Sequence, residues 1–143
     1  MGTVYATITI KNQFDINKVE LGLIKGEDIR QATVEAVVDT GAITLFITEE
    51  LRQQLGLGIV GEWPVFVANG AVEMAKRTEA VEVHWEDRSM VCRPNVLLNS
   101  SEILLGVIPM EDMDLIVDPA REALVGAHGD KILHRALGGI RML

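Results

Sequence analysis

The residues best suited to chemistry in this chain are Asp39, Thr40 and Gly41, which follow the β-branched pair Val37 and Val38. The Asp-Thr-Gly triplet occurs once in the 143 residues. A strand that becomes fully apolar as it reaches a carboxyl group is typical of a site at the edge of a core. Glycine in the third position lets backbone and substrate approach closely, because it has no Cβ. These features make Asp39 a candidate catalytic residue.

Paired carboxyl groups can hydrolyse a peptide bond without a metal. The ionised member takes a proton from water, and the neutral member donates one to the substrate carbonyl. Two like charges about 3 Å apart do not both ionise, so such a pair shares one proton. One carboxyl cannot fill both roles, and this chemistry therefore needs a second Asp.

A second motif, Glu-Ile-Leu-Leu-Gly, spans residues 102–106 and ends in two apolar residues and a glycine. With this motif and the triplet, the sequence resembles the retropepsin-like (clan AA) aspartic proteases. Residues 51–57, which end in Leu-Gly-Leu, are similar to bacterial and archaeal single-domain members. The resemblance covers residues 3–125.

The resemblance implies an all-β fold, a closed or nearly closed retropepsin-like β-barrel with one or two short helices. Pepsin-like enzymes hold two such lobes in one chain, whereas this chain has a single triplet. A C2 homodimer is therefore expected, with Asp39 from both subunits at its axis. The resemblance also implies that the Thr40 hydroxyl bonds across to the partner loop. It assigns active-site loop support to Thr40, Gly41 and Ala42, and an apolar loop beside the site to Leu104, Leu105 and Gly106.

Residues 65–75 are the candidate flap, a hairpin that would cover the site. Asn69 and Gly70 lie between apolar flanks and tolerate the positive φ of a tight turn. The expected flap and substrate-binding residues are Ala68, Asn69 and Gly70. A plain hairpin turn is the alternative. Ile43 and Thr44 stand where retroviral members usually carry acidic residues that bind substrate backbone, so retroviral cleavage preferences are not expected.

The remaining pattern predicts mainly strands. A helix should begin after the N-cap Thr48 and end at Gly56, with Leu51 and Leu55 on one face. The predicted strands are residues 3–10, 29–38, 78–85, 90–98 and 103–107. A short helix is expected at 109–113 and a closing hairpin from 115–117 and 123–125. Residues 15–28 fit either a strand or a helical turn.

The chain is expected to form one domain, residues 1–126, followed by a basic tail, residues 127–143. The tail carries Lys131, Arg135 and Arg141 against one acid, Asp130. Disorder is the alternative to a tail helix, because Gly138 and Gly139 interrupt the pattern. The apolar residues at helical spacing are Ile132, Leu133, Ala136, Leu137 and Ile140.

The composition limits the kinds of partner and the cellular compartment that are expected for this chain. The net charge of -8 argues against a nucleic-acid partner. No apolar run approaches the roughly 20 residues that cross a membrane, and the start reads as a strand, not a signal peptide. The single Cys92 fits a reducing compartment, so a cytoplasmic location is expected. His84, His128 and His134 lack metal-ligand spacing, and neither a metal nor a cofactor is expected.

The sequence therefore predicts an aspartic endopeptidase that acts on a peptide or protein substrate. Two alternatives remain open. The dimer could have lost proteolysis and serve as a peptide-binding or assembly module. The chain could instead be a β interaction domain in which the triplet is a structural turn.

Overall fold

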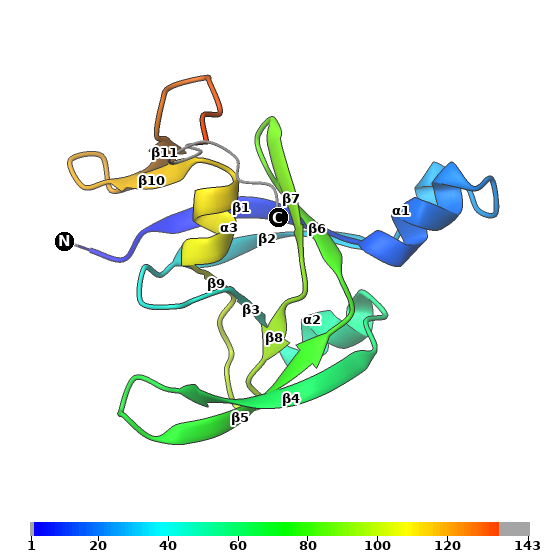
Figure 1. Cartoon of the computed structure of the whole chain (residues 1–143), viewed down its shortest axis with the longest axis horizontal. Coiled ribbons are helices and arrows are strands. Elements are labelled where there is room, and N and C mark those ends of the chain that lie inside the picture. Colours follow the sequence, from blue (N-terminus) through cyan, green and yellow to red (C-terminus); the bar gives the residue numbers. More distant parts are fainter. Residues whose placement is uncertain (1, 135–143) are drawn as a thin grey trace, which may run out of the picture.

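The strands on either side of the Asp-Thr-Gly triplet lie in one curled sheet. The computed structural model describes residues 2–134, and Figure 1 shows a mostly β molecule with a few short helices. The sheet order is β4-β5-β8-β3-β9-β2-β1-β6-β7. Its strands are β1 (Tyr5–Asn12), β2 (Gln31–Val38), β3 (Leu45–Ile47), β4 (Ile59–Phe66), β5 (Val72–Thr78), β6 (Val81–Trp85), β7 (Arg88–Cys92), β8 (Asn95–Val96) and β9 (Leu104–Leu105).

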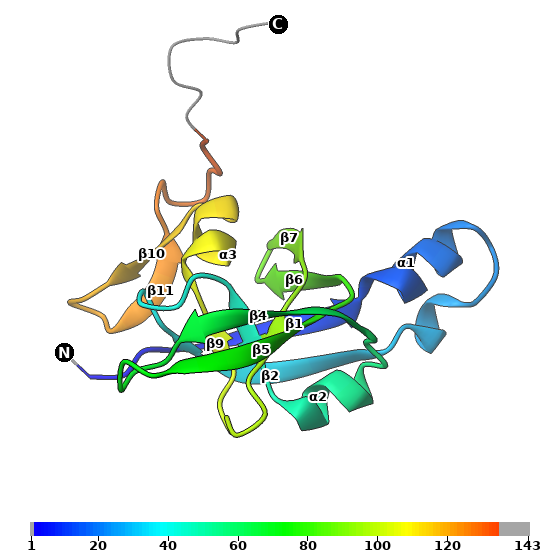
Figure 2. The same ribbon diagram turned by 60° about the horizontal axis from the view of Figure 1, so that its bottom comes forward.

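The sheet curls into a half-barrel, with β4 and β7 as its two edges in the described part of the chain. It is therefore more open than the closed barrel that was one of the expected forms. A separate two-stranded sheet pairs β10 (Leu115–Asp118) with β11 (Ala123–Gly126), as the predicted closing hairpin requires. Figure 2 shows the long β4–β5 hairpin lying across the molecule, and Figure 1 shows it on the opposite side of the molecule from β10 and β11.

Strand periodicity accounts for the core. Ala6, Ile8 and Ile10 alternate along β1 and are all buried, because side chains of one strand point to opposite faces in turn. They pack with buried residues of β3 and β6 in one large cluster. No helix among residues 2–134 is long and apolar enough to span a membrane.

The structure confirms the predicted helix after Thr48. It forms α2 (Glu49–Gln54), and the Thr48 hydroxyl accepts a hydrogen bond from the Leu51 amide at 3.1 Å. Gly56 follows with φ +67°, a conformation that favours glycine at a helix end. Leu51 and Leu55 are buried. The second expected helix is α3 (Val107–Asp112).

A third helix, α1 (Gln13–Glu20), occupies part of the segment that the sequence left open. Asn12 ends β1, and its side-chain oxygen caps α1 by accepting a hydrogen bond from the Asp15 amide at 3.0 Å. Its side-chain amide also donates to the Leu55 carbonyl at 2.8 Å, which buries it. A 3-10 turn, Gly26–Asp28, completes this excursion. Figure 1 shows α1 projecting from one end of the molecule.

Some strand boundaries differ from the prediction. The strand predicted at 90–98 is divided into β7 and β8 at Arg93 and Pro94, because proline has no amide hydrogen for the ladder. The strand predicted at 103–107 is only β9, since Val107 already begins α3. The strand predicted at 78–85 begins at Val81 as β6, and Thr78 ends β5.

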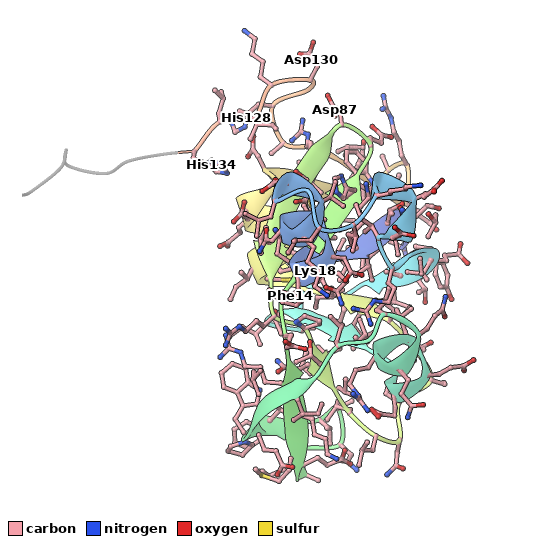
Figure 3. The ribbon with its side chains drawn as sticks, turned by 90° about the vertical axis from the view of Figure 1, so that its right-hand side faces the viewer. Phe14, Lys18, Asp87, His128, Asp130 and His134 are labelled. Carbon is pink, nitrogen blue, oxygen red and sulfur yellow. The ribbon has the colours of Figure 1, made fainter. Side chains whose placement is uncertain are left out.

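Residues 127–134, the described part of the tail, pack against the end of α3. The buried Arg88 guanidinium donates to the carbonyls of Asp114 (2.8 Å) and Gly129 (2.6 Å). His128 Nδ1 lies 2.7 Å from the Asp114 carboxylate, and Figure 3 shows this histidine at the end of the molecule far from β4 and β5. Ile132 and Leu133 lie in this segment without helical structure. The other residues of the predicted tail helix, Ala136, Leu137 and Ile140, lie outside the described residues.

Candidate active site

The two sequence motifs lie side by side. Strand β2 pairs with β9 in parallel, which places Val37 opposite Leu104 and Val38 opposite Leu105. The Asp39 amide then donates to the Leu105 carbonyl at 3.0 Å. The pairing of β2 with Leu104 and Leu105 therefore fixes the end of β2 and, with it, the position of Asp39.

Hydrogen bonds hold the loop after Asp39 in a tight turn. The Ala42 amide donates to the Asp39 carbonyl at 3.1 Å, and the Gly41 amide donates to Asp39 Oδ1 at 2.8 Å. The start of α3 secures the far side, where the Val107 amide donates to the Ala42 carbonyl at 2.9 Å. One carboxylate oxygen thus has a fixed partner within its own loop.

Gly106 is required by the closeness of this contact. A Cβ at Gly106 would lie 2.3 Å from the Thr44 carbonyl oxygen and 2.6 Å from that of Ala42. Both are backbone atoms, which a larger residue could not displace without moving the loop. Glycine in the Leu-Leu-Gly motif therefore allows the Asp39 loop and α3 to approach each other.

Asp39 opens onto a groove of about 570 Å³ between its loop and the β4–β5 hairpin. The hairpin contributes residues 64–68, Phe46 and Leu104 line the groove from the sheet, and Leu97 lines it from just after β8. Asp39 is the one ionisable residue among the lining residues that the structure describes. The groove is therefore an apolar channel with a single carboxylate at one side.

The candidate flap is a hairpin whose turn has the expected residues. Gly70 has φ +82°, and its amide donates to the Val67 carbonyl at 2.8 Å. Asn69 Oδ1 accepts from the Ala71 amide at 2.9 Å. Ala68 lines the groove, whereas Asn69 and Gly70 form the turn itself.

The floor of the groove was not identified from the sequence. Phe46 and Leu97 carry no distinguishing signal in the sequence, because apolar residues in or beside strands give the same pattern whether they face a core or a groove. Phe46 packs with Ala42 and Ala75 in a small cluster separate from the main core. The folded structure, in which Ala42 and Phe46 also line the groove, is needed to show that this small cluster lies beneath it.

Among the described residues, Asp39 supplies the single carboxylate of the groove. Thr40 is exposed, and its hydroxyl makes no hydrogen bond within residues 2–134.

Burial raises the pKa of the Cys92 thiol to about 12, with a further contribution from the Asp112 carboxylate, so this thiol is a poor nucleophile. Across the same described range, no group of three His, Cys, Asp or Glu side chains could hold a metal ion.

Known structures resemble this fold. The retroviral protease-like domain of Ddi1 from Leishmania major aligns with a TM-score of 0.55 and 16% identity, over 92% of this chain and 91% of that one. A retropepsin-like aspartic protease from Rickettsia conorii aligns with a TM-score of 0.49 and 16% identity, over 82% and 77%. No protein-family model and no curated protein matches the sequence. The chain has a retropepsin-like fold, as its motifs predicted.

Proposed function

We propose that the chain is an aspartic endopeptidase that acts as a C2 homodimer. The observation that carries this proposal is the position of Asp39, which shares one apolar groove with the candidate flap. An extended peptide laid in this groove would bring a backbone carbonyl to the carboxylate. The retropepsin-like fold supports the same reading.

In the proposed reaction, water lies between Asp39 and the partner's Asp39. The ionised carboxylate takes a proton from water, whose oxygen forms a bond to the scissile carbon, while the neutral carboxyl protonates the carbonyl oxygen. One hydroxyl of the resulting diol then gives its proton to the ionised carboxylate and re-forms the carbonyl, while the C–N bond breaks and the amine leaves with a proton from the neutral carboxyl. The bond from the Gly41 amide to Asp39 Oδ1 would hold the carboxylate in the orientation that the reaction needs.

Side chains around the loop support a second copy at this place. Ile43 is 61% exposed and Ile108 is 48% exposed, and a hydrogen bond from the Ile108 amide to the Ile43 carbonyl keeps the two residues together. Two exposed apolar side chains beside the catalytic loop would be covered by the second subunit in the proposed dimer. The free Thr40 hydroxyl would then bond to the partner loop.

The Asp39→Asn variant tests the mechanism. It should fold normally and lose cleavage of a peptide library to background, because its amide cannot take a proton from water. Asp87→Asn is the matched control, since Asp87 is exposed in the β6–β7 turn and lies far from the hairpin in Figure 3. Equal cleavage by Asp39→Asn and parent would contradict the mechanism. Peptide binding by a parent chain that cleaves nothing would indicate a binding module.

A further inference from the structure

We propose that the groove continues into a polar subsite, built by Arg77 and Asn95, that binds an acidic side chain of the peptide substrate. This inference rests on the proposed function, because it assigns the peptide that the Asp39 groove would select. Its basis is a row of paired residues across the sheet.

The row begins at the groove floor and leads away from it. Leu104 pairs with Phe46, Phe46 with Asn95, and Asn95 with Arg77, on the adjacent strands β9, β3, β8 and β5. Directly paired residues point from the same face of a sheet. Leu104 and Phe46 line the groove, so Asn95 and Arg77 extend the same face beyond it.

Asn95 and Arg77 lack the hydrogen bonds that buried polar groups normally have. Asn95 is 0% exposed, and neither its Oδ1 nor its Nδ2 has a partner in the described part of the chain. The Nε of Arg77 is also buried without a partner there. Native proteins rarely leave such groups unpaired, since each loses its water without compensation. The pair is therefore suited to a ligand that supplies the missing partners.

The environment of Arg77 favours an anionic ligand. Its guanidinium lies 4.6 Å from the centroid of the Trp63 ring, and no carboxylate within residues 2–134 forms an ion pair with it. Gly61 is its partner on β4, and a Cβ at Gly61 would meet nothing within 4 Å. There is thus open space beside a charged group held against an aromatic ring.

A carboxylate matches the free donors, because guanidinium and amide N–H groups can both donate to its oxygens. Three strand spacings of about 4.8 Å separate Leu104 from Arg77. An extended peptide advances about 3.4 Å per residue, so the acidic residue would lie roughly three to five residues from the scissile bond. The net charge of -8 favours basic peptides at long range. A preference for acid would therefore come from the local site.

The test uses acetylated and amidated dodecapeptides with an apolar centre. A single Glu is moved outward from the centre and compared with Gln and Lys at each position. Binding is measured by calorimetry on full-length Asp39→Asn, and cleavage is measured on the parent. At one position, Glu should bind about tenfold more tightly than Gln.

Three variants in the Asp39→Asn chain locate the effect. Arg77→Met keeps the aliphatic stem and should abolish the Glu preference. Gly61→Leu leaves both donors intact but fills the open space, and should also abolish it. Arg121→Met removes the same charge from an exposed residue, 77% exposed in its side chain, in the β10–β11 turn and should leave the preference unchanged.

The outcomes separate the subsite from the proteolytic function. The subsite is overturned if no position prefers Glu, if the preference survives Arg77→Met, or if Arg121→Met removes it equally. A parent chain that cleaves peptides without a Glu preference would overturn the subsite alone. Arg77-dependent binding without cleavage by the parent would support the subsite and contradict the protease. Neither binding nor cleavage would overturn both.

Discussion

Gly41 determines how closely the backbone approaches the Asp39 carboxylate. Its amide donates to Asp39 Oδ1 at 2.8 Å, and a Cβ at Gly41 would lie 3.1 Å from the same oxygen. This is a tighter contact than carbon and oxygen normally make, so the carboxylate would have to shift by a few tenths of an ångström. Gly41 does not have a positive φ, so alanine would not strain its backbone.

Gly41→Ala should therefore separate activity from stability. We expect the free energy of unfolding to change by no more than about 0.5 kcal/mol, while kcat falls about tenfold or more because the reacting oxygen moves. Urea unfolding and peptide cleavage measure the two effects. Gly26→Ala is the control, since a Cβ there meets nothing within 4 Å. Unchanged cleavage by Gly41→Ala would show that the position of Oδ1 does not limit the reaction.

At the scale of elements, one ion pair ties α1 to Arg30, the residue before β2. The Asp15 carboxylate is almost fully buried and accepts hydrogen bonds from Arg30 Nε at 2.8 Å and Nη2 at 2.9 Å. It also accepts from the Arg30 amide at 3.0 Å. These bonds hold the pKa of Asp15 below its ordinary value, with the Arg30 side chain as the largest cause. The contact secures the chain just before β2, which leads to Asp39.

The pair should stabilise the fold in a pH-dependent way. A carboxyl whose pKa is lowered by folding stabilises the protein above its unfolded pKa, near 4, and loses this contribution as the pH falls through the folded value. Asp15→Asn should cost about 1–3 kcal/mol at pH 6. The difference from the parent should shrink below pH 4. Urea unfolding at pH 6, 4 and 3 measures it, with Asp87→Asn as control. If Asp15→Asn lowered the free energy of unfolding equally at pH 6, 4 and 3, the pH-dependent contribution assigned to the Asp15–Arg30 pair would be contradicted.

Local signals explain which elements the sequence predicted. Thr48 caps the start of α2 and Gly56 follows its C-cap residue, Leu55, so both helix ends are set within the same short segment. Asn69 and Gly70 form the hairpin turn in the same way. The motif predicted the Asp39 loop, although the loop is fixed by a hydrogen bond from the Asp39 amide to the distant Leu105 carbonyl.

Long-range contacts explain what the sequence did not predict. Helix α1 depends on Asn12, whose second hydrogen bond goes to the distant Leu55 carbonyl. Strands β8 and β9 have two residues each, and their neighbours in the sheet define them more than their own pattern does. Asn95 carries no signal of its own, because its unpaired amide is recognised only after β3 and β5 are placed beside it.

At the scale of the whole molecule, one chain supplies one carboxylate to the groove that residues 2–134 describe. The proposed chemistry needs two, and the chain contains a single Asp-Thr-Gly triplet. A site shared between two chains, as proposed, would make activity depend on the pairing of chains. A site contained in one chain would make activity depend only on the number of intact chains.

Mixing parent with Asp39→Asn chains distinguishes these cases. If every site takes Asp39 from both subunits, random exchange leaves active dimers in proportion to the square of the parent fraction. Equal mixing should then leave about a quarter of the activity, compared with about half for simple dilution. Mass-tagged subunits verify that exchange is complete before cleavage is measured. Asp87→Asn chains, mixed in the same ratio, should leave activity unchanged, because they keep Asp39. A loss that follows the parent fraction linearly after verified exchange would mean that each chain works alone.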